Sequence, residues 1–182
     1  EFATHGFTEA SLNRIIAAAG LSKGSMYYYF DSKDDLYAHL LRVQVEQLIA
    51  RAGPFPVPTA VDPDAYWSTI EGHCLRLVRA LDASPQLASL LRDWMSGAGT
   101  PALRQAQRDA EQTTLPWLTQ ALAAGQASGA IRTDIPDALL LAVSMAIGRV
   151  IDSWVIAEAP DPHEHAAAVH AIVGMLRRAI QP

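Results

Sequence analysis

Apolar residues recur along most of the chain at spacings of three and four residues, which place them on one face of a helix. Near the N-terminus, Leu12, Ile15, Ile16 and Ala19 follow this spacing, and the segment 169–180 repeats it near the C-terminus. No segment shows the alternation of apolar and polar residues between hairpin turns that is typical of a β-strand. The pattern therefore predicts an all-α fold.

Helix boundaries are marked by local signals. Four predicted helices begin with a capping residue followed by proline, at Asp62-Pro63, Ser84-Pro85, Thr100-Pro101 and Asp161-Pro162. Glycines that suit helix ends stand at Gly6, Gly20, Gly53, Gly97 and Gly129. These signals predict the end of a first helix at Thr4 and further helices over 12–19, 23–29, 33–51, 63–83, 85–96, 101–127, 136–157 and 162–180.

A proline-rich joint, Gly-Pro-Phe-Pro-Val-Pro at 53–58, interrupts this series. Three prolines within five residues favour an extended, semi-rigid connection over a flexible coil. We therefore expect two domains, residues 1–52 and residues 53–182, the second an antiparallel helical bundle.

Composition narrows the class of protein. The 182 residues carry a net charge of -5, so the overall charge does not by itself indicate a nucleic-acid binder. A single cysteine, Cys74, excludes an internal disulfide and favours a reducing compartment. The most apolar stretch, 138–157, contains Arg149 and Asp152 and so does not fit a membrane span. We expect a cytoplasmic protein with no membrane partner.

The first fifty residues contain a helix-turn-helix pattern. The helix over 12–19 is broken at Gly20-Leu21, and Ser22 caps the next helix. Such a unit lets the N-terminal end of its second helix enter the major groove of DNA. That end presents Lys23, Gly24 and Ser25, which are small or basic and leave room for close approach.

The residues from Gly6 to Leu36 resemble the DNA-binding region of the TetR (tetracycline-repressor) family of transcriptional regulators. The resemblance rests on Gly6-Phe7 followed by SLNRIIAAAGLSKGSMYYYFDSKDDL at 11–36, where the aromatic run, the Ser-Lys start of the next helix and the acidic pair occur together. It covers roughly the first fifty residues. Two features depart from the family pattern: Tyr29 stands where many relatives have His, and residues 1–52 hold five Lys or Arg against six Asp or Glu.

The resemblance implies a role for each matched position. Lys23, Gly24 and Ser25 would face base edges, with Asn13 near them. Phosphates would be held by Ser11, Tyr27, Tyr28 and Lys33. Taken singly, Tyr27 and Phe30 suit the core of the small domain better, whereas Tyr28 suits the surface.

The last two predicted helices indicate self-association. The helix over 136–157 is apolar nearly all round, so it is buried on two sides, and a second copy of the chain most simply covers the second side. The alternative is that both helices form only the core of the protomer. The predicted dimer interface contains Leu140, Ile147, Ile151, Trp154, Val169, Ile172 and Leu176. A two-fold dimer would read a pseudo-palindromic double-stranded DNA operator.

Aromatic residues of the second domain suggest a ligand pocket, with the core as the alternative reading. One tryptophan falls in each of four predicted helices, and Pro116 interrupts one of them. The predicted effector pocket is lined by some of Trp67, Ile70, Cys74, Trp94, Met95, Trp117 and Met145. This lining favours a small apolar or amphipathic effector, while His73, Arg76 and Arg92 would alternatively favour an anionic group.

These observations favour a transcriptional repressor, a homodimer released from its operator by a small effector. Catalysis has little support, because no Asp or Asn is placed to orient His73 beside Cys74. His163, His165 and His170 lack the i, i+4 spacing of a helical zinc site, so we expect neither a metal nor a cofactor. A helical adaptor that binds protein and uses the helix-turn-helix only for packing is the other candidate, and an enzyme is the third.

Overall fold

The computed structural model describes residues 1–59, 62–96, 101–157 and 162–182. Every regular element within these ranges is a helix and none is a strand, which confirms the all-α prediction. The helices are α1 (Phe2–Glu9), α2 (Leu12–Ala18), α3 (Lys23–Tyr29), α4 (Lys33–Ala52), α5 (Pro63–Asp82), α6 (Pro85–Ser96), α7 (Pro101–Ala127), α8 (Asp137–Ala157) and α9 (Pro162–Ile180). None of them, within the described residues, is long and apolar enough to cross a membrane.

The predicted helix ends agree with these bounds to within one residue, apart from a short helical segment after Gly6. The helix is interrupted at Gly6, close to the predicted end at Thr4, and the helical structure that follows the kink and runs to Glu9 was not predicted. Gly6 itself has a φ of 72°, a left-handed conformation that glycine adopts without strain, and it kinks α1.

Side-chain caps fix several helix starts. The hydroxyls of Ser11, Ser22 and Ser32 accept hydrogen bonds from backbone N–H groups in the first turns of α2, α3 and α4. The Asp62 carboxylate accepts from two backbone N–H groups at the start of α5. The predicted caps Thr100 and Asp161 and the predicted stop Gly97 lie outside the described residues.

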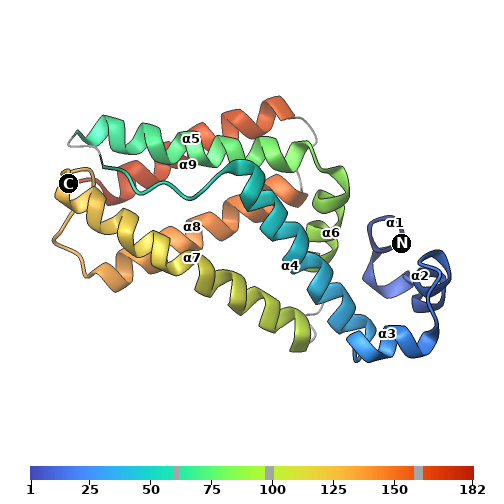
Figure 1. Ribbon diagram of the computed structural model, residues 1–182. Coiled ribbons are helices and arrows are strands. Elements are labelled where there is room, and N and C mark those ends of the chain that lie inside the picture. Colours follow the sequence, from blue (N-terminus) through green and yellow to red (C-terminus); the bar gives the residue numbers. More distant parts are fainter. Residues whose placement is uncertain (60–61, 97–100, 158–161) are drawn as a thin grey trace.

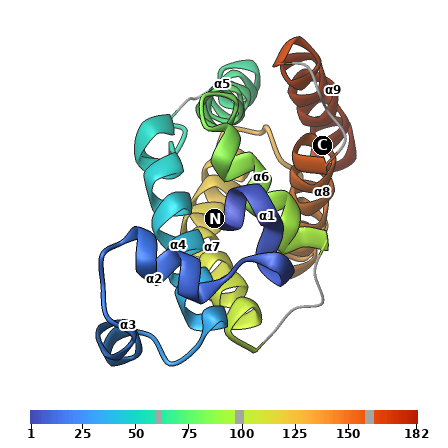
Figure 2. The same cartoon turned by 90° about the vertical axis from the view of Figure 1, so that its right-hand side faces the viewer.

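Helices α1–α3 lie at one end of the molecule, and α4 leads from them into a bundle that contains α5, α7, α8 and α9 (Figure 1). Helix α4 packs against α5 and α7, α5 packs against α9, and α8 packs against α6 and α9. Helix α6 lies between the two ends and packs against α1, which stands in front of it in Figure 2. Helices α4 and α6 therefore join the two ends of the molecule.

Two clusters of buried apolar residues hold this arrangement together. The junction cluster joins α1, α4, α6 and the end of α8, and it contains Phe2, Ala10, Tyr37, Leu41, Leu81, Leu87, Leu90, Leu91 and Ile156. The scaffold cluster lies within the bundle and contains Tyr66, Trp67, Ile70, Ala121, Leu122, Ala130, Ile131, Leu140, Val169, Val173 and Ile180. The junction cluster thus crosses the position of the expected domain boundary, since α6 follows that boundary in the chain.

Candidate functional site

The helix-turn-helix unit is built by α2, the turn at Gly20 and α3. The hydroxyl of Ser22 accepts from the Ser25 N–H at 3.0 Å and lies 2.9 Å from the Ser25 hydroxyl. Two contacts between these residues therefore stabilise the first turn of α3. Met26 is buried and anchors the helix. Helix α3 stands at the edge of the molecule, away from the bundle (Figure 2).

The outer surface of α3 is open to solvent. Lys23 and Gly24 are exposed, and Tyr27 and Tyr28 expose 50% and 80% of their surfaces. Tyr27 therefore lies on the surface, and its assignment to the core was wrong; Phe30, by contrast, is half-buried with its ring 5.3 Å from that of His39. Hydroxyl groups and a positive charge are thus available along one helix, as contact with DNA requires.

Most basic residues of 1–52 are bound to the protein itself. Arg14 pairs with Glu1, Arg42 pairs with Glu46, and Arg51 donates to the Ser84 hydroxyl. The Lys23 ammonium has no hydrogen bond or ion pair with any described residue. Lys23 is therefore available to a partner outside the chain, at the end of α3 where the sequence predicted DNA contact.

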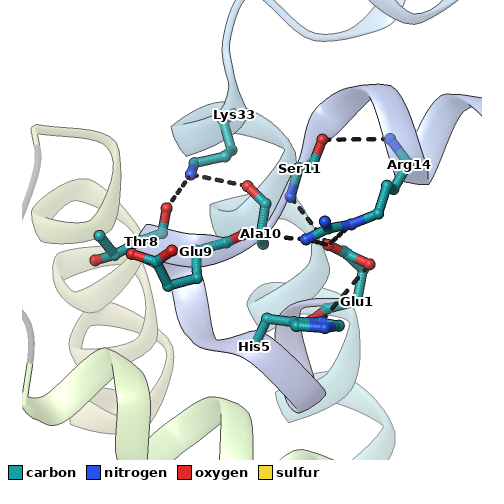
Figure 3. A network of polar contacts seen from close by, with 8 residues as sticks. All are labelled: Glu1, His5, Thr8, Glu9, Ala10, Ser11, Arg14 and Lys33. Atoms are coloured by element: carbon teal, nitrogen blue, oxygen red, sulfur yellow. Dashed lines mark hydrogen bonds and ion pairs between the residues drawn. The ribbon is translucent and has the colours of Figure 1, made fainter.

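Lys33 has an internal role. Its ammonium donates to the carbonyls of Thr8 and Ala10 at 3.0 and 3.1 Å (Figure 3). It also lies 4.7 Å from the centre of the Phe7 ring. It therefore ties the start of α4 to the end of α1. Two of its three donors are thus used within the protein, and its contact with a phosphate stays a prediction.

A second polar network fastens α1 to α2. The Glu1 carboxylate accepts from the Arg14 guanidinium at 2.9 Å and from the Ser11 N–H at 3.0 Å (Figure 3). The Arg14 guanidinium, helped by the Ser11 N–H, holds the pKa of Glu1 at about 2. Of the predicted DNA contacts on α2, Ser11 is half-buried and serves as the cap, whereas Asn13 is exposed.

Asp93 of α6 joins the bundle to the DNA-binding end. Its carboxylate accepts from the Phe7 N–H at 2.7 Å and from the Tyr37 hydroxyl at 2.9 Å. The same hydroxyl lies 3.0 Å from the Leu90 carbonyl, and burial together with Asp93 raises the pKa of Tyr37 well above its usual value. Sequence reasoning missed Asp93, because a single acidic residue on a helix carries no pattern that distinguishes it from a solvated one.

Comparison with known proteins agrees with this geometry. The profile of "Bacterial regulatory proteins, tetR family" matches residues 1–40. The chain is 34% identical over 154 residues to the HTH-type transcriptional repressor SCO4008 of Streptomyces coelicolor, covering 83% of this chain and 73% of the relative. The chain belongs to the TetR family of bacterial regulatory proteins.

Other TetR-family proteins show more distant similarity. The HTH-type transcriptional repressor Rv1474c of Mycobacterium tuberculosis is 26% identical over 185 residues, covering 97% of this chain and 87% of the relative. The transcriptional regulator FadR from Bacillus subtilis, solved in complex with stearoyl-CoA, superposes with a TM-score of 0.73 at 20% identity over 99% of this chain and 94% of that one. At that identity, the likeness shows the fold that this TetR-family chain shares.

The seven residues predicted to contribute to the effector pocket of this TetR-family chain do not all lie together. Trp67 and Ile70 are buried in the scaffold cluster, and Cys74 and Trp117 pack against it. Trp94 instead packs against the junction cluster, Met95 is exposed and Met145 is half-buried on α8. A groove of about 600 Å³ bordered by α1, α2 and α4 contains none of the seven predicted residues. The seven therefore divide between two regions.

The predicted dimer interface is partly corrected. Leu140 and Val169 are buried in the scaffold cluster, so they belong to the core of the protomer. Ile147, Ile172 and Leu176 are half-buried, Trp154 is exposed, and the side chain of Ile151 lies outside the described residues. The outer faces of α8 and α9, which lie side by side in Figure 2, carry other exposed apolar residues that sequence reasoning missed, namely Leu139, Val150 and Met175.

Proposed function

We propose that this TetR-family chain is a transcriptional repressor whose homodimer binds a pseudo-palindromic operator and leaves it when a small apolar or amphipathic molecule binds. The observation that carries the proposal is the exposed N-terminal end of α3, where Lys23 has no partner among the described residues. The names of the two repressors to which the chain is similar support this direction of regulation. The proposal places the protein in the cytoplasm, where bacterial DNA lies, and assigns it no catalytic role.

Each exposed group near α3 suits one kind of DNA contact. Lys23 can donate to guanine O6 or N7, and Asn13 can pair with an adenine edge. Gly24 has no side chain, and a Cβ there would meet only the Ser22 hydroxyl at 3.7 Å, so the helix can approach the bases closely. Tyr27 and Tyr28 can hold phosphates through their hydroxyls, and Ser25 lies beside Lys23 in the first turn.

The outer face of α8 and α9 suits the dimer contact. Val150 exposes 70% of its surface, and Leu139, Trp154 and Met175 are also exposed. Exposed apolar residues that gather on neighbouring helices favour contact with another protein surface. Because the two copies would be related by a two-fold axis, their α3 helices would meet half-sites about one DNA turn apart, roughly 34–36 Å.

Effector action requires two arrangements of the dimer that bind the effector with different affinity. The junction cluster supports such coupling, because α6 reaches α1 through Asp93 and reaches the end of α8 through Arg92, which donates to the Ile156 carbonyl at 2.9 Å. A change in the bundle that moves α6 would therefore move α1 and α4, which carry the helix-turn-helix.

A mobility-shift titration of the full-length protein against the DNA upstream of its own gene tests the proposal. We expect saturable binding that weakens steeply as salt rises and that Lys23→Ala weakens about tenfold or more. The matched control is Arg79→Ala, which removes one exposed positive charge from α5 and leaves α3 unchanged.

The control separates a specific contact from a change in total charge. An equal loss of operator affinity in Lys23→Ala and Arg79→Ala would contradict a specific DNA contact by α3. Absence of binding both to this DNA and to a random-sequence pool would favour the protein-binding adaptor instead.

A further inference from the structure

His73 carries a buried polar atom without a partner. The residue lies in α5 with 1% of its surface exposed, and its Nε2 has no hydrogen-bond partner among the described residues. Nearly all buried polar atoms in proteins are hydrogen-bonded, so an orphaned ring nitrogen marks a place where a further molecule can bind.

The neighbouring arginine decides which ring nitrogen holds the proton. The Arg76 Nη2 lies 3.2 Å from the His73 Nδ1, and a guanidinium can only donate, so Nδ1 accepts. Burial and the positive charge of Arg76 lower the pKa of His73, which keeps the ring neutral. A neutral imidazole holds one proton, so Nε2 carries it. The unpartnered group is therefore an N–H donor.

Two aromatic rings pack against the His73 ring. The ring centre of Phe55, in the linker after α4, lies 4.9 Å from that of His73, and the ring centre of Trp117, in α7, lies 6.1 Å from it. Phe55 and Trp117 also contact each other, with centres 4.8 Å apart. An apolar surface with one placed polar group is the usual composition of a site for a small molecule.

We propose that the His73 Nε2–H anchors the effector, and that the effector is an apolar molecule carrying a hydrogen-bond acceptor oxygen. The inference rests on the proposed function and narrows its ligand class. The positive charge of Arg76 beside the ring favours a carbonyl or carboxylate oxygen and disfavours a cationic group. The site includes Trp117 from the predicted pocket and adds Phe55 and His73.

The linker connects this site to the DNA-binding end. Because His73 is buried and Phe55 packs against its ring, a molecule that binds Nε2 from the side of the linker displaces Phe55. The linker around Phe55 is held by Arg76 Nε, which donates to the Ala52 carbonyl at 3.0 Å, and by Trp117 Nε1, which donates to the Pro56 carbonyl at 2.6 Å. Displacement of Phe55 therefore acts on the segment directly after α4, the helix that leads to the helix-turn-helix.

Nitrogen-detected NMR of the full-length protein tests the first step. At neutral pH we expect the His73 ring to carry its proton on Nε2, with the signal assigned by its loss in His73→Asn. A proton on Nδ1 would overturn the proposal, because the unpartnered Nε2 would then be an acceptor.

Three probes with one carbon skeleton test the second step: acetophenone, which has an acceptor oxygen, ethylbenzene, which has none, and 1-phenylethylamine, which is cationic. We expect acetophenone to bind about tenfold more tightly than either of the others, as judged from saturable shifts of the His73 and Trp117 signals. His73→Asn keeps an acceptor for Arg76 but ends short of the Nε2 position, so this preference should disappear. His73→Gln, whose amide N–H reaches that position, should restore part of it.

Equal affinity for acetophenone and ethylbenzene, no saturable shift with acetophenone, or a preference that survives in His73→Asn would each overturn the proposal. An ordered water on Nε2 that the probes do not displace would give one of these results. Mobility shifts on the same samples separate this failure from that of the proposed function. Operator binding by wild type and His73→Asn alike would support the repressor proposal whatever the probes do. Absence of operator binding in both would contradict the repressor proposal, and the probe measurements, which use no DNA, would still test the His73 site.

Discussion

Tyr37 in the junction cluster and Tyr66 in the scaffold cluster are both buried, and the hydroxyl of each lies 3.0 Å from a backbone carbonyl of another helix. Burial raises the pKa of Tyr66 to about 12, and apolar side chains surround the residue. Tyr37 also contacts the Asp93 carboxylate, which in turn accepts from the backbone of α1. The scaffold cluster thus rests on apolar packing, whereas the junction cluster adds a charged group that links α6 to α1 and to α4.

This difference teaches where a conformational change can occur. Apolar packing has no preferred partner atoms, but a carboxylate with directed hydrogen bonds favours one arrangement of its helices over others. A regulator needs a rigid scaffold and a junction with two discrete states. Paired substitutions, one in the junction cluster and one in the scaffold cluster or one on each of two exposed surfaces, can therefore test this difference.

The largest effect is expected on the outer side of the scaffold helices. Val150→Arg places a charge beside Arg149 on the exposed face of α8 and should convert the dimer to a monomer, lowering operator affinity by about 100-fold or more because one half-site is lost. Sedimentation and mobility shifts measure the two effects. Leu115→Arg, an equivalent change at an exposed position of α7, should leave both unchanged; dimers that persist in Val150→Arg would place the interface elsewhere.

Leucine truncation separates the two clusters directly. Leu87 and Leu140 each expose 2% of their surface, one in the junction cluster and one in the scaffold cluster. We expect Leu87→Ala and Leu140→Ala to lower the free energy of unfolding by about 2–5 kcal/mol each, measured by urea titration. In folded protein, only Leu87→Ala should also change operator affinity, and equal effects on DNA binding would remove the distinction between the clusters.

Removal of the two tyrosine hydroxyls sharpens the same comparison. Tyr37→Phe and Tyr66→Phe should each lower the free energy of unfolding by about 1–2 kcal/mol, because each removes a buried hydroxyl that donates a hydrogen bond to another helix. Tyr37→Phe should also alter effector-dependent release of DNA, since Asp93 then keeps fewer partners at the junction. A release curve that changes in Tyr66→Phe and not in Tyr37→Phe would contradict the assigned role of α6.

Helix caps give a smaller effect in each region. Ser22→Ala removes the cap of α3 and Asp62→Ala removes the cap of α5, and each should lower the free energy of unfolding by about 1 kcal/mol. Operator affinity should fall only in Ser22→Ala, because that cap orders the turn that holds Lys23. Matched urea titrations and mobility shifts measure both quantities.

The smallest effect is a pH dependence from His73. Its pKa is lowered in the folded protein by burial and by Arg76, so the unfolded chain takes up a proton at a higher pH than the folded chain. This contribution to stability is complete above the ordinary histidine pKa near 6.5 and is lost as pH falls from there toward the lowered value. The fall in stability between pH 7.5 and 5.5 should therefore be smaller in His73→Asn than in wild type, and an equal fall in both would show that His73 is not the group that titrates.

The helix starts and the DNA-binding end could be predicted from the sequence because their determinants are local. Ser22 and Asp62 cap helices through atoms two or three residues away, and the motif from Gly6 to Leu36 lies within one short segment. Gly6 interrupts the first helix as predicted, and only the short helical segment that follows it was missed. The residues assigned to DNA contact on α2 and α3 remain predictions that the mobility shifts test.

Tertiary structure alone decided which side chains meet. Helix α8 is apolar nearly all round, so its periodicity could not show that Leu140 faces inward while Leu139 and Val150 face outward; packing against α9 made that choice. The same holds for contacts between segments far apart in the chain, such as Asp93 with the Phe7 N–H and His73 with Phe55. A cap needs only its neighbours, whereas a buried pair needs the whole fold to bring it together.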